Sequence, residues 1–200
     1  MYRLADTVHP CRAHVKQLVS SVQNETTPPV LETERLRLRP HEVTDFDACV
    51  AMWSDPLVTR FTIGDPAPAP ATWRRLLAYR GHWLLLGFGY WAVEEKSTGR
   101  FIGELGFAEF KRDIQPSIEG IPELGWALIP DAHGKGYATE ALRAVVAWGD
   151  NHFGSAQTVC IIYSDNVASF RVAEKLGYTE LRPLTKDGQH GSVLVRAARS

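Results

Sequence analysis

The sequence lacks an excess of charge of either sign. Its 22 Lys and Arg stand against 23 Asp and Glu, which gives a formal net charge of −1 over 200 residues. Proteins that bind nucleic acid or an acidic membrane electrostatically carry a strong positive bias. We therefore expect neither nucleic acid nor a membrane among the partners, and any phosphate site must be built locally.

Cysteine is equally scarce. Cys11, Cys49 and Cys160 are odd in number, widely separated and without CxxC spacing. This pattern argues against a disulfide framework and against a structural zinc site, and we expect no metal. The sequence also lacks an apolar run near the roughly 20 residues needed to cross a bilayer, and residues 1–20 lack the apolar core of a signal peptide. Together these absences predict a cytoplasmic protein with free thiols.

What is present is an apolar content of 44%, which is typical of a folded globule, in a length that favours one domain. We treat residues 1–30 as an N-terminal extension, in which Arg12–Val22 fits a short helix. Leu36 and Leu38 then alternate with arginines in the period of a half-buried strand. This change of pattern predicts that the domain itself occupies residues 31–200.

The hydrophobic periodicity and turn residues beyond this strand predict alternating helices and strands. The expected elements are, in order, a helix from Thr44 to Trp53 with a Thr44–Asp47 capping box, a loop over 64–70, a helix from Thr72 to about Gly81, hairpin strands over 89–94 and 101–107, an irregular connection over 111–122, a strand over 124–129, a long helix after Gly136, a strand over 159–163, a helix over 167–176 and closing strands near 178–181 and 192–196. This order predicts an α/β fold with crossover helices.

A glycine loop, His133-Gly134-Lys135-Gly136, separates the strand over 124–129 from the long helix. Glycine lets the backbone approach a ligand and turn successive N–H groups outward. The following helix adds unpaired N–H groups and the positive end of its dipole, which together favour a phosphate or pyrophosphate. A tight turn without a ligand is the alternative. The loop is no Walker loop, because it lacks the final Gly-Lys-Ser/Thr, and GxGxxG fails at Thr139.

A second motif runs from Asn166 to Gly177, after the strand over 159–163. Asn166 occupies the N-cap position of a helix, and Gly177 suits the left-handed position at its C-terminal end. An ordinary capped helix would explain much of this pattern by itself.

Taken together, these segments resemble the acetyl-CoA-binding half of the GCN5-related N-acetyltransferases (GNAT), whose glycine loop is followed by a strand, an Asn and a helix. Three stretches further resemble the RimJ/RimL-like branch, named for ribosomal-protein N-terminal acetyltransferases: Glu32 to Pro40 (ETERLRLRP), Gly134 to Leu142 (GKGYATEAL) and Asn166 to Gly177. The resemblance covers about residues 31–196. It implies a single mixed, mostly antiparallel sheet, splayed at two parallel strands and flanked by helices.

The resemblance also implies transfer of an acetyl group from acetyl-CoA to a primary amine by direct attack in a ternary complex. The pyrophosphate would meet N–H groups from Ala132 through Ala138, the pantetheine would pair with the strand backbone, and an N–H near Leu128 would stabilise the oxyanion. The residues that it assigns to the coenzyme are Trp126, Ala127, Leu128, Ile129, His133, Gly134, Lys135, Gly136, Tyr137, Ala138, Asn166 and Ser169.

The sequence departs from the family pattern at two positions. Asp131 replaces the usual Gln or Arg before the glycine loop, and we expect its carboxylate to face solvent, away from the pyrophosphate. Ala173 stands where many relatives carry a Tyr that protonates the leaving thiolate. In the RimJ/RimL-like branch Ser169 is the suggested substitute, with a merely small helix residue as the alternative and Tyr163 and Tyr178 in reserve.

The attacking amine must lose a proton, so a carboxylate or imidazole should accept it. The resemblance points to Glu123 and Glu104, with solvated strand-end carboxylates as the alternative and His82 as a further option. Five aromatic residues either line an acceptor pocket or form core: Phe61, Trp73, Trp83, Phe88 and Trp91. The acceptor, a protein N-terminus or a small molecule, is left open, as are a longer acyl donor, a homodimer and a non-catalytic acyl-CoA-binding or regulatory domain.

Overall fold

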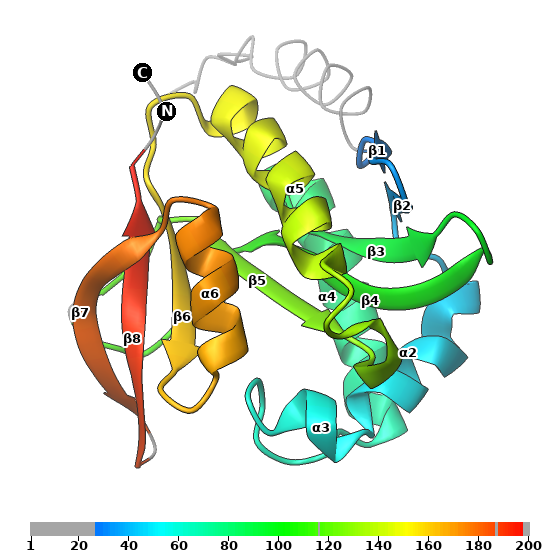
Figure 1. Ribbon diagram of the computed structural model, residues 1–200, viewed down its shortest axis with the longest axis horizontal. Coiled ribbons are helices and arrows are strands. Elements are labelled where there is room, and N and C mark those ends of the chain that lie inside the picture. Colours follow the sequence, from blue (N-terminus) through cyan, green and yellow to red (C-terminus); the bar gives the residue numbers. More distant parts are fainter. Residues whose placement is uncertain (1–26, 116, 187, 198–200) are drawn as a thin grey trace, which may run out of the picture.

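The computed structural model describes residues 27–115, 117–186 and 188–197. Cys11 and the expected helix over Arg12–Val22 lie outside the described residues. Within the described part, an eight-stranded sheet has the order β1-β2-β3-β4-β5-β6-β8-β7, with helices against both of its faces (Figure 1). The predicted fold class, a mixed and mostly antiparallel sheet flanked by helices, is confirmed.

The strands are β1 (Leu31–Glu32), β2 (Leu36–Arg39), β3 (Tyr90–Glu95), β4 (Arg100–Ala108), β5 (Glu123–Leu128), β6 (Thr158–Tyr163), β7 (Thr179–Lys186) and β8 (Gln189–Arg196). The helices are α2 (Phe46–Trp53), α3 (Pro56–Thr59), α4 (Ala69–Leu86), α5 (Tyr137–Phe153) and α6 (Val167–Lys175), with short 3-10 helices η1 (Val43–Asp45) and η2 (Pro130–Ala132). The pairing is antiparallel throughout these strands except between β5 and β6.

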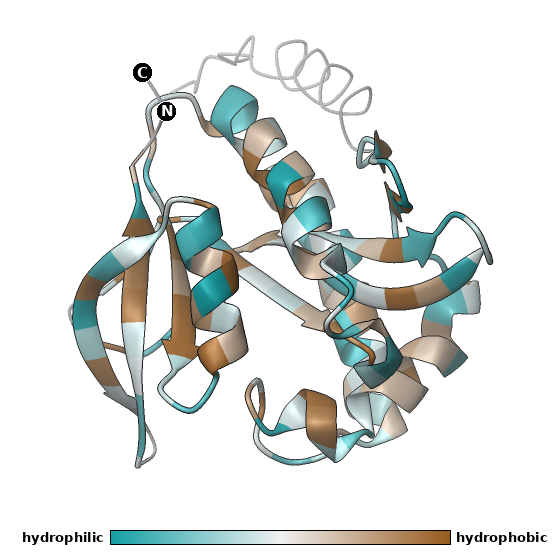
Figure 2. Ribbon diagram, in the orientation of Figure 1, coloured by the Kyte–Doolittle hydropathy of each residue, from teal (hydrophilic) through white to brown (hydrophobic). Residues whose placement is uncertain are grey.

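Helices α5 and α6 cover one face of the sheet. The apolar face of α5 packs there, with Ala141, Leu142 and Val145 in one buried cluster with Leu105 and Leu124 of the sheet. Hydrophilic and hydrophobic residues alternate along α5 and α6 in Figure 2, as expected of helices with one face on a sheet. This cluster is the main core.

Helices α2 and α4 cover the opposite face. Met52 and Leu76 pack there with Ala92 and Ala127, and side-chain alternation along β5 puts Ala127 on the face opposite Leu124. The same alternation places Glu123 with Ala127, on the α2 and α4 side. The carboxylate side chain of Glu123 therefore faces these two helices.

Two expected helix starts are wrong. The capping box is formed two residues earlier, by Glu42, the N-cap of η1, and Asp45, because Asp45 also accepts two hydrogen bonds from Arg39 and is fixed there. Helix α4 begins at Ala69 after Pro68 and continues past Gly81 to the left-handed Gly87. Proline is tolerated in the first turn of a helix, so α4 includes Pro70. A single glycine is tolerated in a helix interior, so Gly81 does not end α4.

The closing strands are longer than expected. Strand β7 runs through Pro183, which is possible because β7 is the last strand of the sheet and needs no partner on its outer side.

The aromatic residues expected either in an acceptor pocket or in the core have different positions. Trp83 and Trp91 are buried core residues in edge contact with Trp148, whereas Phe61 lines a cavity. In the described residues, no helix has the length and apolar character to span a membrane.

Candidate active site

Strands β5 and β6 pair at one position, Glu123 opposite Val159, and then diverge. Figure 1 shows the two strands separating from each other beyond this pair. A cavity of about 270 Å³ lies here. Its lining comes from α2, the segment after α3, α4, β3, the segment before β5, β5, β6 and α6: Trp53, Phe61, Thr62, Ile63, Arg75, Tyr79, Tyr90, Phe110, Arg112, Glu123, Leu124, Gly125, Trp126, Ala127, Ile161, Tyr163, Asn166 and Ser169.

The backbone of β5 turns N–H and C=O groups toward this opening. Ile129 N donates to Ile102 O at 3.0 Å, and bonded and non-bonded pairs alternate along an antiparallel ladder. Leu128 and Trp126 therefore turn their N–H and C=O groups away from β4 and toward β6. His133 Nε2 lies 2.9 Å from Leu128 O, which agrees with that direction and fixes the imidazole in the loop.

The glycine loop at the end of β5 exposes a continuous series of amides. Gly134 and Gly136 have φ of 73° and 80°, which other residues adopt only with strain. Within the described residues, the N–H groups of residues 134–139 have no acceptor, whereas those of Ala132 and His133 donate to Ile129 and Pro130. The series of unpaired N–H groups thus begins two residues after Ala132, where the predicted contacts to the pyrophosphate begin, and it leads into the N-terminus of α5.

Asp131 does not compete with an anion at this loop. Its side chain is 75% exposed and pairs with Arg100 at 3.1 Å. The expectation that this carboxylate faces solvent is confirmed.

The segment around β1 and β2 forms hydrogen bonds with the glycine loop and with the first turn of α5. Glu140 accepts hydrogen bonds from the Thr33 hydroxyl, the Arg35 backbone N–H and Arg35 Nε, at 2.6, 2.8 and 2.7 Å. Arg35 Nη1 also donates to Lys135 O at 3.0 Å, and its guanidinium lies over the Tyr137 ring. The two sequence motifs around Arg35 and Gly134 are therefore one structural unit.

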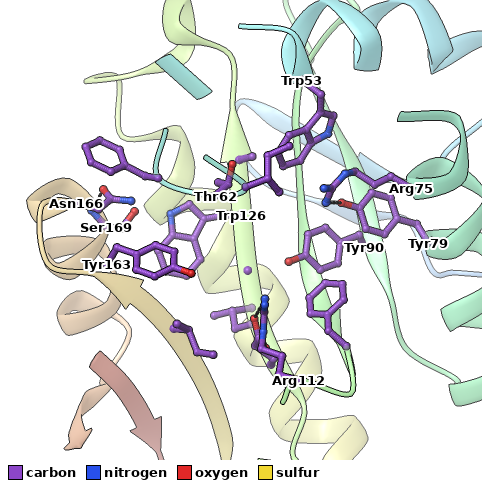
Figure 3. Close-up of a pocket in the computed structure, with 18 residues that line it drawn as sticks. Trp53, Thr62, Arg75, Tyr79, Tyr90, Arg112, Trp126, Tyr163, Asn166 and Ser169 are labelled. Carbon is purple, nitrogen blue, oxygen red and sulfur yellow. Dashed lines mark hydrogen bonds and ion pairs between the residues drawn. The ribbon is translucent and has the colours of Figure 1, made fainter. Parts of the chain in front are cut away.

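Helix α6 brings two predicted residues to the cavity. Asn166 Oδ1 accepts a hydrogen bond from Ser169 N at 3.2 Å, which confirms the N-cap and leaves the amide NH₂ free to donate. Asn166, Ser169 and Tyr163 all line the cavity, near Trp126 (Figure 3). Ala173 is fully buried in the core, and Tyr178 is buried and bonded to Thr158, so neither reaches the cavity.

The two candidate bases are buried, and the alternative of solvated strand-end carboxylates is wrong. Glu123 is 4% exposed and lines the cavity. Arg112 holds both of its oxygens, with Nε to Oε2 at 2.5 Å and Nη2 to Oε1 at 2.7 Å. Such a bidentate pair fixes the position and orientation of the carboxylate. His82, the further option, has its pKa lowered by burial and does not line the cavity.

Glu104 lies behind the cavity wall. Its Oε1 accepts hydrogen bonds from Trp53 Nε1, at 3.0 Å, and from the Tyr79 hydroxyl. Its Oε2 lies 3.4 Å from His41 Nε2 and 4.0 Å from Cys49 Sγ, so these three side chains form a buried polar cluster. Burial and the nearby Glu104 raise the pKa of Tyr79 well above its usual range, so the phenol keeps its proton.

Sequence reasoning missed the acceptor-side lining. Arg75 of α4 stacks over the Trp53 ring, with Cζ 3.9 Å from its centroid, and its Nη1 lies 3.4 Å from the Tyr79 hydroxyl. The hydroxyl of Tyr90 also reaches the cavity, where a Cβ at Gly125 would lie 2.0 Å from it. In the sequence Arg74 and Arg75 form an ordinary charged pair on a helix, and no local signal separates the exposed arginine from the one in the cavity.

Comparison with known proteins agrees with this geometry. The profile of the acetyltransferase (GNAT) domain family matches residues 35–179. An uncharacterized N-acetyltransferase of Bacillus subtilis, YoaA, is 28% identical over 157 residues, covering 75% of this chain and 82% of that protein.

Solved structures give the same result. The crystal structure of an acetyltransferase of Agrobacterium tumefaciens is similar with a TM-score of 0.71 and 30% identity, covering 85% of this chain and 95% of that one. A spermidine N-acetyltransferase of Vibrio cholerae, solved with CoA and spermine, shares the fold at a TM-score of 0.66 and 15% identity, covering 82% and 96%. A family profile that spans most of the chain, together with the splayed sheet and its glycine loop, shows that this protein belongs to the GNAT acetyltransferase family.

Proposed function

We propose that the protein transfers an acetyl group from acetyl-CoA to a primary amine by direct attack in a ternary complex. The observation that carries this proposal is the series of unpaired N–H groups over residues 134–139, next to a cavity that opens between β5 and β6. Amides at a helix N-terminus bind a pyrophosphate without needing a lysine cluster. The cavity then provides room for the thioester and the acceptor.

The coenzyme fits the remaining geometry as an added strand. The backbone of Trp126 and Leu128 faces the opening, so the pantetheine can bond there, with the Asn166 amide donating from the other side. The Leu128 N–H is in place to stabilise the oxyanion of the tetrahedral intermediate. His133 supports this arrangement from the loop, by holding the Leu128 carbonyl.

Two side chains carry the proton transfers in this proposal. Ser169 donates a proton or a hydrogen bond to the CoA thiolate, because it is the hydroxyl on α6 that lines the cavity. Glu123 accepts the amine proton, through a water molecule. Arg112 fixes the Glu123 carboxylate in the cavity lining through two hydrogen bonds, so that it is in place to act as the base. Glu104 is the other candidate, and its route to the substrate would pass through the Tyr79 hydroxyl.

A thermal-shift titration with CoA and acetyl-CoA tests the coenzyme site, since a ligand of the native state raises its stability by mass action. We expect the melting temperature to rise for the natural protein and not for Gly134→Asp, whose carboxylate would occupy the anion site. Gly188→Asp is the matched control, because Gly188 also has a positive φ of 77° and open space around it but lies in the turn between β7 and β8. No rise in the natural protein would contradict the proposal.

A second candidate, a non-catalytic acyl-CoA-binding domain, is favoured by one observation, the core position of Ala173 where relatives place a tyrosine. Turnover with a panel of amines distinguishes the two. Robust acetylation that falls on Ser169→Ala excludes the non-catalytic candidate.

The RimJ/RimL-like branch is a finer proposal and has its own support. Two of its motif segments bind each other through Arg35 and Glu140, and the third supplies the Asn166 cap. The same proposal includes a cytoplasmic location and a homodimer. Acetylation of peptide N-termini, measured beside small amines, tests the branch.

A further inference from the structure

The cavity contains one guanidinium without a carboxylate partner. Arg112 is neutralised by its two hydrogen bonds to Glu123, but Arg75, within the described residues, has no Asp or Glu oxygen at ion-pairing distance. Its contacts are the face of Trp53 and the Tyr79 hydroxyl. Arginine keeps its charge in proteins, so the lining, with Arg75 and Arg112 against Glu123, carries a net positive charge.

Glu104 attracts the charge of Arg75 from a distance but makes no ion-pair contact with it among the described residues. It is 1% exposed, and its Oε1 is used by Trp53 and Tyr79. Arg75 contacts the same two side chains from the cavity side, so Trp53 and Tyr79 lie between the guanidinium and the carboxylate. Figure 3 shows the guanidinium of Arg75 next to Trp53 and Tyr79 on one wall of the cavity.

A second free donor lies beside Arg75. Tyr90 stacks on Tyr79 with ring centroids 4.6 Å apart, and its hydroxyl has no hydrogen-bond partner among the described residues. Burial and the nearby carboxylates of Glu123 and Glu104 raise the pKa of Tyr90, so the hydroxyl keeps its proton and can donate. Gly125 makes room for this hydroxyl, since a side chain there would collide with it. A guanidinium without a carboxylate partner and a phenol without an acceptor form a site for an anion.

We propose that Arg75, with Tyr90, binds a carboxylate of the acceptor, so that the acceptors of this protein are small primary amines that also carry a carboxylate. This inference rests on the proposed acetyl transfer. In Figure 3 Asn166, Ser169 and Trp126 lie on the wall opposite Arg75 and Tyr90. An acceptor across the cavity therefore places its amine at the thioester and its anion at Arg75. A polyamine would meet the guanidinium as a like charge, with Glu104 out of its reach.

The test is acetylation of matched amines by the natural protein at constant acetyl-CoA. The panel contains α-amino acids and ω-amino acids of two to six carbons, the amide of each, the amine lacking the carboxylate, and spermidine. We expect kcat/KM for the best amino acid to exceed that of its amide at least tenfold, the range of a charge-assisted hydrogen bond. Arg75→Gln should reduce this ratio to near one, Arg75→Lys should keep part of it, and Tyr90→Phe should reduce it severalfold.

The exposed neighbour Arg74 gives the control, and Arg74→Gln should leave the ratio unchanged. The thermal shift with CoA, measured on every variant, reports folding and separates the two proposals. If CoA does not bind the natural protein, the acetyltransferase proposal fails. If CoA binds but amides or spermidine are acetylated as well as the acids, if no acid in the panel is acetylated, or if a folded Arg75→Gln keeps the ratio, the carboxylate inference is overturned.

Discussion

Glu140, in the first turn of α5, accepts a hydrogen bond from Arg35 Nε at 2.7 Å and thereby ties the glycine loop to the start of β2. The same carboxylate accepts hydrogen bonds from the Thr33 hydroxyl and the Arg35 N–H, while Arg35 reaches on to the carbonyl of Lys135. Glycine is needed in the loop because of the positive φ angles, but it also allows many other backbone conformations. The hydrogen bonds among Thr33, Arg35, Lys135 and Glu140, called the clamp below, restrict the loop to the observed conformation. The loop is then organised before the coenzyme arrives, which lowers the entropy cost of binding.

Loosening this clamp should weaken coenzyme binding without touching the site itself. Glu140→Gln keeps the shape but loses the ion pair, and we expect the Kd for CoA to rise severalfold, about 1 kcal/mol. Glu140→Ala should raise it further. Isothermal titration calorimetry measures the change, and Glu174→Gln on the exposed face of α6 is the matched control. Unchanged affinity in a folded Glu140→Ala would show that the loop is organised without the clamp.

Ser169→Ala tests the proton donor to the thiolate. The N-cap survives this change, because the bond to Asn166 comes from the backbone N–H of residue 169. We expect kcat to fall about 10- to 100-fold, within the range of general acid catalysis, with little change in the KM for acetyl-CoA. Ser164→Ala, an exposed serine after β6, should keep full activity. A kcat within twofold of the natural value would remove Ser169 from the mechanism.

Substitutions can distinguish Glu123 from Glu104 as the base, because only Glu123 lines the cavity. Glu123→Gln should lower kcat/KM about 100-fold, because the carboxylate in the cavity lining is lost. Arg112→Gln keeps that carboxylate but removes the two hydrogen bonds that orient it, and should cause a smaller loss of kcat/KM. A larger loss in Glu104→Gln, shared by Tyr79→Phe, would instead assign the proton to the Tyr79 route.

The order of strands and helices could be predicted because each element has a local cause. The alternation at Leu36 and Leu38, the apolar stripe of α5 and the cap at Asn166 all depend on neighbours in sequence. The C-terminal end of helix α4 could not be predicted, because Leu84 and Leu85 are exposed and the sequence beyond Gly81 shows no amphipathic pattern.

The acceptor side could not be predicted, because it is made by long-range contacts. Arg75 depends on Trp53, 22 positions earlier, and on the absence of any acid within reach, which only the assembled structure reveals. Glu123 was named from the sequence, but its pairing with Arg112, through an irregular connection, was not. Coenzyme sites use backbone in a regular register, whereas acceptor sites use side chains from separate elements.

Acid should weaken the fold through the buried pair that anchors η1. Asp45 is 4% exposed; burial alone would raise its pKa, but the hydrogen bonds from Arg39 and from Glu42 N–H outweigh this and lower it below the usual value. A carboxyl whose pKa is lower in the folded state than the unfolded value of about 3.9 stabilises the protein above that pH. The contribution is lost as the pH falls through the folded pKa.

Asp45→Asn isolates this contribution. We expect it to lower the free energy of unfolding by about 2 kcal/mol at pH 7, the scale of hydrogen bonds to a charged group, with an m-value unchanged in urea titrations. At pH 3 the difference from the natural protein should shrink, because the natural carboxyl is itself becoming protonated. Exposed Asp47→Asn, two residues along, should show no such pH dependence. A difference that stays constant from pH 7 to pH 3 would mean that Asp45 acts by shape and capping alone, and not through its charge on Arg39.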